Sequence, residues 1–388
     1  MRTKIWIVGT FAALGLIVGL WAQDGPNSQG SQTVARPRKA PSADNGNTNN
    51  NAPADSDADQ PKIPSKLSPK ATKDNTTDAD ATFKAETNVV NVDVQVLDNN
   101  GNPIPNIPRD RFRILEDNVP QTLTQFNVGE APMTVALVVE FSARFQAFYS
   151  SGWAETLTAS YGFVQSLKPD DYLAVIAYDL HSTILSDFTN DRTKTMDAMS
   201  RLRIPGFSES NMFDALADTA DRMSKIEGRK AIVLIASGID TFSKLTYDKA
   251  RKALQESGVP IYSIEMLQIE RILAEARGGM GPSQELTFLQ ADNELKTFGK
   301  ETGGQAYFPR FIQELPGVFQ SISQSLRNQY SLGYSPNNQA RDGKFRKITV
   351  QLVNPGTNEP LRMVNEKGKP MKYTILAKAG YTAPRAVE

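Results

Sequence analysis

The chain has 388 residues, and its 43 Lys and Arg residues balance its 43 Asp and Glu residues, so the formal net charge is zero. A protein that binds nucleic acid normally carries an excess of basic residues on one face, so we expect no nucleic-acid partner. The chain has no cysteine, which excludes disulfides, Cys-ligated zinc, iron–sulfur clusters and thiol catalysis. Its one histidine, His181, excludes multi-histidine metal sites and would have to serve any Ser-His-Asp triad.

The first 22 residues predict an export signal. Arg2 and Lys4 precede an apolar run from Ile5 to Ala22, which is the pattern of a secretory signal peptide. Leu20 fits a cleavage site after Ala22 poorly, and the 18 residues of the run reach the lower limit for spanning a bilayer. Residues 1–22 are therefore either a cleaved signal peptide or an uncleaved anchor that tethers the chain to a membrane through residues 5–22. Both interpretations predict an exported protein, located in the periplasm or cell envelope or secreted.

Residues 23–82 have the composition of a disordered linker. They contain no aromatic residue, and their only large aliphatic side chains are Val34, Ile63 and Leu67. So few apolar side chains cannot offset the entropy that is lost when the chain becomes ordered. We expect a flexible spacer that holds the folded part away from a membrane or wall.

Two segments, residues 83–130 and 329–384, predict β-strands. Apolar and polar residues alternate from Val90 to Val96, as in a half-buried strand. Further strands are expected at Phe112–Asp117, Leu123–Val128, Tyr330–Tyr334, Phe345–Val353 and Tyr373–Ala377. Because neither segment alone has enough strands to be stable, we expect the two to form one small β-sandwich.

Residues 131–328 alternate between apolar strands and amphipathic helices. Buried strands are expected at Thr134–Val139, Tyr172–Tyr178, Ala231–Ala236 and Pro260–Met266, and a last one within Thr302–Phe308. Helices are expected at Trp153–Val164, Asp191–Leu202, Asn211–Ile226, Tyr247–Ser257 and Phe311–Gln329. This alternation predicts an α/β domain with a doubly wound, mostly parallel sheet, whose ligands bind at the carboxyl ends of the strands. The segment Leu267–Leu295 predicts a helical insertion, interrupted by glycines, that serves as a functional loop or a lid.

Motifs for common catalytic chemistry are missing from the sequence. It contains neither a phosphate-binding P-loop nor a GxSxG nucleophile elbow. His181 follows Asp179 and Leu180 in a predicted strand-to-strand turn, which is typical of a solvated histidine. We therefore expect no catalytic residue and no enzymatic activity.

Three loops lie at the predicted carboxyl ends of the strands. They are Glu140-Phe141-Ser142-Ala143-Arg144, the segment from Gly206 to Leu216, and Ala236-Ser237-Gly238-Ile239-Asp240-Thr241. With their strands, these loops resemble a von Willebrand factor A-type (VWA) domain. The flanking sequences Val90–Val94, Phe112–Gln121, Leu326–Tyr334 and Arg341–Ile348 extend the resemblance over residues 85–384, to the VWFA-related family described from acidobacteria. The resemblance implies a VWA-like fold and an adhesion or scaffold role.

The resemblance further implies that the three loops hold a divalent cation, usually magnesium. In VWA domains the first loop contributes Asp-x-Ser-x-Ser, the second a Thr and the third an Asp. The matching positions here are Glu140, Ser142 and Arg144 in the first loop, Ser210 in the second and Ser237 in the third. A longer carboxylate displaces the tight octahedral shell of magnesium, and a guanidinium repels a cation. We therefore expect a degenerate site without metal or other cofactor.

Two alternatives for this site remain open. Arg144 either occupies the position of the cation and pairs with Glu140, or it points to solvent. If a metal such as magnesium is retained, its expected ligands are Ser142, Ser210 and Asp240.

Several aromatic residues lie in or near the three loops. Phe141, Phe145 and Phe207 are expected to contact a ligand, whereas Phe148 and Met212 are expected to be core residues. We therefore expect an exported binding module for a protein partner, whose identity the sequence does not reveal. Three other functions stay open, namely a magnesium-dependent adhesion protein, an envelope hydrolase with Leu267–Leu295 as a lid, and a purely structural envelope component.

Overall fold

The computed structural model describes residues 89–386, except residues 129–130, 144–152, 203–206 and 365–367. The signal or anchor and the linker predicted for residues 1–82 lie outside the described residues. Among the described residues, no helix is both long and apolar enough to cross a membrane.

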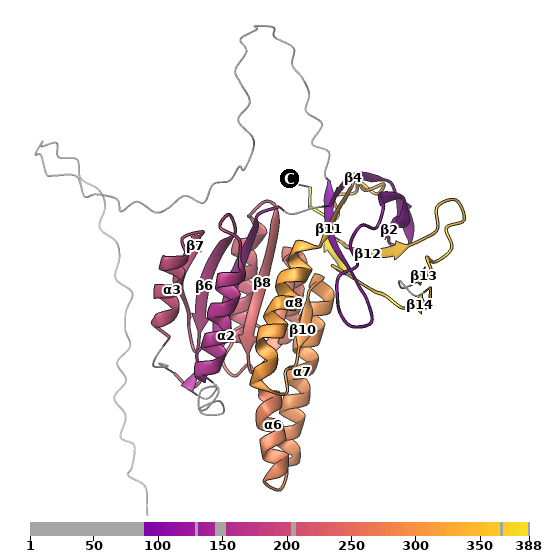
Figure 1. Cartoon of the computed structure of the whole chain (residues 1–388). Helices are drawn as coiled ribbons and strands as arrows, with labels where there is room; N and C mark the ends of the chain where they lie inside the picture. Colours follow the sequence, from indigo (N-terminus) through magenta and orange to yellow (C-terminus); the bar gives the residue numbers. More distant parts are fainter. Residues whose placement is uncertain (1–88, 129–130, 144–152, 203–206, 365–367, 387–388) are drawn as a thin grey trace, which may run out of the picture. The chain divides into compact units, whose positions relative to one another are not determined.

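Six strands form the central sheet, in the order β10-β9-β8-β5-β6-β7 (Figure 1). They are β5 (Met133–Glu140), β6 (Tyr172–Tyr178), β7 (Ser182–Thr189), β8 (Arg229–Ala236), β9 (Ile261–Glu265) and β10 (Gln305–Tyr307). All neighbours pair in parallel except β6 and β7, which are antiparallel. This confirms the predicted α/β class with a mostly parallel sheet. Strand β7 follows the predicted strand-to-strand turn at His181, but its bounds were not predicted, because most of its side chains are polar and none is fully buried.

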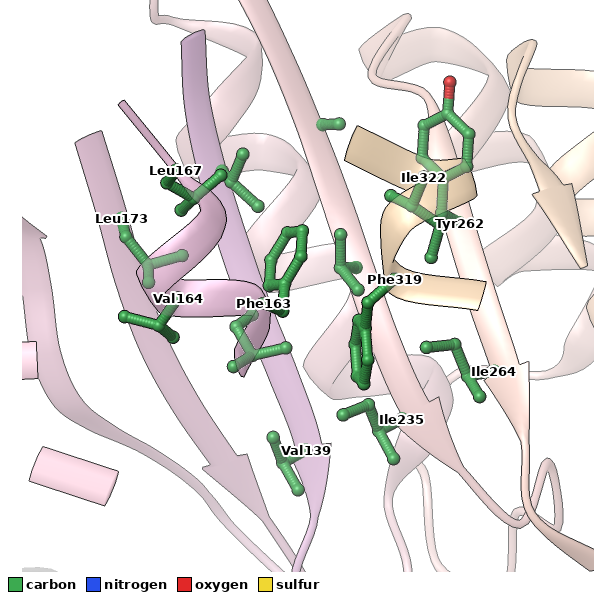
Figure 2. Packing of buried hydrophobic residues seen from close by; sticks show 14 of the residues in the cluster. Val139, Phe163, Val164, Leu167, Leu173, Ile235, Tyr262, Ile264, Phe319 and Ile322 are labelled. Atoms are coloured by element: carbon green, nitrogen blue, oxygen red, sulfur yellow. The ribbon is translucent and has the colours of Figure 1, made fainter. Parts of the chain in front are cut away.

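Helices cover both faces of the sheet. They are α2 (Trp153–Ser166), α3 (Arg192–Ser200), α4 (Met212–Ser224), α5 (Tyr247–Ser257), α6 (Leu267–Ala276), α7 (Pro282–Thr302) and α8 (Leu315–Arg327), the last preceded by the 3-10 turn η2 (Ile312–Glu314). Because side chains alternate along a strand, Leu137 packs with α2 and α8, while Val138 packs with α4, α5 and α7. Figure 2 shows Phe163 of α2 and Phe319 of α8 in the first of these layers, with ring centroids 5.3 Å apart. Both faces of the sheet are therefore buried, as continuous apolar strands require.

The predicted insertion forms the helices α6 and α7. The chain reverses between them through Gly278 and Gly279, whose φ values of 119° and 91° favour glycine. Pro282 then starts α7, which continues beyond the predicted end at Leu295 to Thr302. Because α6 starts directly after the carboxyl end of β9, the two helices project beyond the strand ends at that edge (Figure 1).

The two flanking segments supply two antiparallel sheets, with strand orders β15-β1-β11-β4 and β16-β12-β2-β3. The strands are β1 (Val90–Leu97), β2 (Phe112–Glu116), β3 (Val119–Gln121), β4 (Leu123–Val128), β11 (Tyr330–Tyr334), β12 (Phe345–Leu352), β15 (Thr374–Ala377) and β16 (Gly380–Thr382), with the 3-10 turn η1 (Arg109–Arg111) before β2. A separate hairpin pairs β13 (Met363–Val364) with β14 (Pro370–Met371). Each four-stranded sheet takes two strands from either segment, and side chains from both sheets share one apolar cluster.

A carboxylate lies inside this apolar region. Glu116 is 2% exposed and accepts hydrogen bonds from the hydroxyls of Tyr334, at 2.7 Å, and Tyr381, at 3.0 Å. Glu116 comes from the N-terminal segment and the two tyrosines come from the C-terminal one. The bonds therefore join the two flanks of the chain.

Candidate functional site

The candidate site lies at the carboxyl ends of β5 and β8. Strand β5 leads through α2 to β6 on one side, whereas β8 lies on its other side, so the direction of the connections reverses between β5 and β8. Ligands of open α/β sheets bind at such a point. Glu140 ends β5 and Ser237 directly follows β8, so the first and third predicted loops meet here.

Glu140 is the centre of a hydrogen-bonded cluster and is only 2% exposed. The Ser142 hydroxyl donates to one carboxylate oxygen at 2.9 Å, and the amide and hydroxyl of Ser237 both donate to the other at 2.7 Å. Burial raises the pKa of Glu140, the bonds from Ser237 and Ser142 oppose that rise, and the charge of Asp240 adds to it. Ser237, at the position where VWA domains have an aspartate, thus serves as a double donor to Glu140.

Asp240 fastens the third loop to the first turn of α4. Its carboxylate accepts from the Phe213 amide at 3.2 Å and from the amide and hydroxyl of Ser243 at 3.2 and 2.5 Å. An acidic group is favourable at a helix N-terminus, where the amides have no partner within the helix. Burial raises the pKa of Asp240, and the bonds from Ser243 and Phe213 work against that rise. Both oxygens of Asp240 therefore already hold the loop in place.

Three buried oxygen atoms next to this cluster lack a hydrogen-bond partner within the described part of the chain. They are the Tyr178 hydroxyl at the end of β6, the Ser210 hydroxyl and the Asn211 side-chain oxygen. Tyr178 is 1% exposed and Ser210 is 3% exposed. The Tyr178 hydroxyl lies near Glu140 and Ser210 without hydrogen-bond geometry to either. Burial, followed by the charge of Glu140, raises the pKa of Tyr178 well above its ordinary value.

Two aromatic side chains are exposed at the loops. Phe207 is 46% exposed with its ring edge-on to that of His181, the centroids 5.8 Å apart, and Phe242 is 61% exposed. Phe141 is half-buried. Met212 is fully buried against the sheet, which confirms the prediction that it is a core residue.

Further carboxylates lie along the same edge of the sheet. Glu294 of α7 is 8% exposed, and burial together with the charge of Asp240 raises the pKa of Glu294. Glu265, at the end of β9, accepts from the Leu267 amide at 2.7 Å. Burial raises the pKa of Glu265 to about 8, and the charge of Asp292 adds to that effect. The edge is therefore acidic across β5, β8 and β9.

These side chains do not fit a magnesium ion. Magnesium requires oxygen ligands in near-octahedral geometry with their lone pairs available. Of the predicted ligands, Ser142 donates to Glu140 and Asp240 accepts from three donors, which leaves only Ser210, beside Tyr178, with a side-chain oxygen that makes no hydrogen bond of standard geometry. No three His, Asp or Glu side chains of the described ranges are grouped so that they could hold a metal ion. The predictions for Arg144, Phe145 and Phe148 fall outside these ranges.

Five predicted site residues lie together at one edge of the sheet, namely Glu140, Ser142, Ser210, Ser237 and Asp240. Tyr178 and Asn211 were not predicted as site residues. Tyr178 is the last residue of an apolar strand and directly precedes a turn, a position that faces the carboxyl edge. This position in the sequence could have identified Tyr178 as a site residue.

No protein-family model and no curated protein matches the chain. Among solved structures, it is similar to the vWF domain of the type V pili tip protein Mfa5 from Porphyromonas gingivalis, with 14% identity and a TM-score of 0.37 over 51% of this chain and 95% of that one. It is also similar to proximal thread matrix protein 1 from the mussel byssus (13% identity, TM-score 0.39, 55% of this chain and 51% of that one). A third similar structure is the PilB minor pilin from Streptococcus sanguinis (10% identity, TM-score 0.37, 51% of this chain and 62% of that one).

The chain thus spans only about half to two thirds of the byssus and pilin proteins. The six-stranded sheet, which is parallel except at one edge, confirms the predicted α/β fold class; a structure with a vWF domain is among those similar to this chain. The functions of the similar proteins are theirs, and the function of this chain depends on its own residues.

Proposed function

We propose that this chain is an exported, non-enzymatic protein-binding module of the adhesion or scaffold type. The carboxyl edge of the six-stranded sheet is the binding face, and it works without a resident metal. Residues 1–22 direct export or anchor the chain, and residues 23–82 act as a spacer. The two flanking sheets form the predicted β-sandwich, which supports the α/β part.

One observation carries the proposal, namely exposed aromatic side chains beside a closed, hydrogen-bonded carboxylate. Phe207 and Phe242 are large apolar groups on loops at the switch point of the sheet. Exposed aromatic side chains at such a position are typical of protein-binding surfaces. Glu140 and Asp240 have their oxygens engaged by hydrogen bonds within the fold, which disfavours the magnesium-dependent alternative.

Site-specific photo-crosslinking tests this proposal. A photo-reactive phenylalanine analogue replaces Phe242 in the full chain, and a matched chain carries it at Val364 of β13, which is also 61% exposed. In intact cells of the source organism, we expect a discrete protein adduct at position 242 that is absent at position 364 and unchanged by chelator. Phe207→Ser in the same chain should weaken the adduct.

Other outcomes favour the alternatives. An adduct that disappears with chelator would favour the metal-dependent adhesion protein. Identical adducts at both positions, or none at position 242, would favour a purely structural envelope component.

A further inference from the structure

The strand-end edge carries more negative charge than the described residues neutralise. Asp292 of α7 pairs with Arg271 at 3.2 Å and lies 3.9 Å from the Lys296 ammonium. By contrast, Glu140, Asp240 and Glu294 take part in none of the ion pairs formed by the described residues. A buried carboxylate without a counter-ion is costly unless something else stabilises its charge.

Three unmet acceptors lie on adjoining segments, since Asn211 follows Ser210 and its amide donates to the carbonyl of Asp179, the residue after Tyr178. The side-chain oxygens of Tyr178, Ser210 and Asn211 are buried and make no hydrogen bond of standard geometry within the described ranges, and the Tyr178 hydroxyl is close to the side chains of Ser210 and Glu140. In folded proteins nearly all buried polar atoms are hydrogen-bonded, so three such atoms together require an explanation. All three can accept a hydrogen bond from a donor that is not part of this fold.

From this arrangement the geometry points to a receptor for the lysine side chain of a protein partner, with the ammonium group bound by Glu140, Tyr178, Ser210 and Asn211. A lysine ammonium has three N–H donors, one for each unmet oxygen, and a charge that complements Glu140. Unlike magnesium, it needs no octahedral shell of oxygens. This inference rests on the proposed protein-binding function of the same face.

The exposed aromatic residues fit the rest of such a side chain. The Phe242 amide donates to the Ser210 carbonyl at 3.0 Å, and the Phe207 carbonyl accepts from the Ala143 amide at 2.7 Å. Both rings therefore belong to loops that form the site. The four-carbon stem of a lysine is apolar and packs favourably on aromatic surface, while its charged end reaches a buried acceptor.

The test uses n-butylammonium, which reproduces the stem and charge of lysine, as a probe for NMR titration of the full chain. We expect saturable shifts of the Ser210, Asn211 and Ser237 amide signals, with a dissociation constant on the order of 10 mM for so small a ligand. Tetramethylammonium at the same ionic strength has no N–H donor and should cause no saturable shift. Methylguanidinium, the matching probe for arginine, should bind more weakly than n-butylammonium.

Variants separate binding from folding. Glu140→Gln removes the charge at nearly constant shape and should weaken n-butylammonium binding at least about tenfold. If Glu140→Gln does not fold, Tyr178→Phe removes one acceptor only and should weaken binding about fivefold. Tyr334→Phe, which removes a tyrosine hydroxyl in the flanking sheets, is the control and should leave binding unchanged.

Three results would overturn the lysine receptor. They are no saturable shift up to roughly 100 mM n-butylammonium, equal shifts with tetramethylammonium, and saturable binding of magnesium at the same amides. If the first or second occurs while the adduct at position 242 persists, the face binds its protein partner by other chemistry and the proposed function stands. Magnesium binding would overturn the metal-free site as well.

Discussion

Glu140 and Glu116 are both carboxylates with 2% exposure, but they lie in different surroundings. In the flanking sheets, Glu116 accepts hydrogen bonds from the hydroxyls of two tyrosines, so these bonds satisfy the carboxylate and both hydroxyls together. At the strand-end edge, Glu140 accepts hydrogen bonds from serine hydroxyls, while the nearby Tyr178 hydroxyl makes no hydrogen bond of standard geometry within the described part of the chain. Asp240 adds a second negative charge there.

The difference separates a structural use of a buried carboxylate from a functional one. Around Glu116 every hydrogen bond is made within the fold, and such a network stabilises and specifies a core. Around Glu140 the fold leaves buried polar atoms without hydrogen bonds, which lowers stability. Such an arrangement is typical of sites where a ligand supplies the missing hydrogen bonds. Each of the following experiments perturbs one side of this comparison.

The largest expected effect is a pH dependence that originates at the strand-end edge. Glu265 has a pKa of about 8 in the folded state against an ordinary value of 4.5, so between these values the folded chain binds more protons than the unfolded one. Its stabilising contribution is complete below pH 4.5 and is lost as the pH rises through about 8. At ~1.4 kcal/mol per pKa unit, the free energy of unfolding should fall by up to about 4 kcal/mol between pH 5 and 8.

Glu265→Gln isolates this contribution, because the amide oxygen still accepts from Leu267 but cannot titrate. Urea unfolding at several pH values should show a shallower decline for the variant than for the wild type. Parallel curves would mean that Glu265 is not the origin of the pH dependence.

The next effect concerns the flanking sheets. Glu116→Ala leaves the hydroxyls of Tyr334 and Tyr381 buried without an acceptor, at about 1–3 kcal/mol each, so unfolding should require about 3 kcal/mol less free energy. Glu359→Ala, at an exposed position between β12 and β13, is the control and should stay within about 0.5 kcal/mol of the wild type. Equal stability of both variants in urea unfolding would show that the tyrosines do not depend on Glu116.

A pair of tyrosine variants compares the two regions directly. Tyr334→Phe removes a hydroxyl that donates to a carboxylate and should cost about 1.5–3 kcal/mol. Tyr178→Phe removes a hydroxyl without a partner and should leave stability unchanged or raise it by up to about 1 kcal/mol. Calorimetric melting of the two variants decides, and equal losses would show that ordered water or another group satisfies Tyr178 within the fold.

The smallest expected effect is at the exposed aromatic rim. Phe242→Ser should change the free energy of unfolding by no more than about 0.5 kcal/mol, because its ring is mostly in solvent. Phe298→Ser is the matched control, since the Phe298 side chain of α7 is 1% exposed and packs against Phe213 and Tyr247, so its loss should cost several kcal/mol, roughly 3–5. Denaturant unfolding distinguishes the two, and a large loss for Phe242→Ser would show that this side chain supports the fold instead of a partner.

The sequence predicted those parts of the fold whose pattern is local. The bounds of Tyr172–Tyr178, Tyr247–Ser257 and Tyr330–Tyr334 match the structure, because continuous apolar runs and helical spacing are visible in one window of sequence. The edge strand Ser182–Thr189 and the short strand Val119–Gln121 have too few buried side chains to show such a pattern.

For the candidate site, the sequence identified the loops but not their hydrogen bonds. Ser237 meets Glu140 across 97 positions of sequence because β5 and β8 pair in a particular register. Tyr178 enters the site through the pairing of β6 with β5. Such geometry depends on tertiary packing, which residue types and spacing do not contain.

The interleaving of the flanking sheets also constrains the order in which this chain folds. Val90 pairs with Tyr334, so the ribosome synthesises β1 long before its partner β11. Contacts of such separation carry a large loop-closure entropy, which the folded α/β part removes by bringing the two segments together. We therefore expect pulse-labelled amides of β5 and β8 to gain protection before those of β1. Until the C-terminal segment is synthesised, the edges of the N-terminal strands are unpaired, so the chain is most prone to aggregation during that interval.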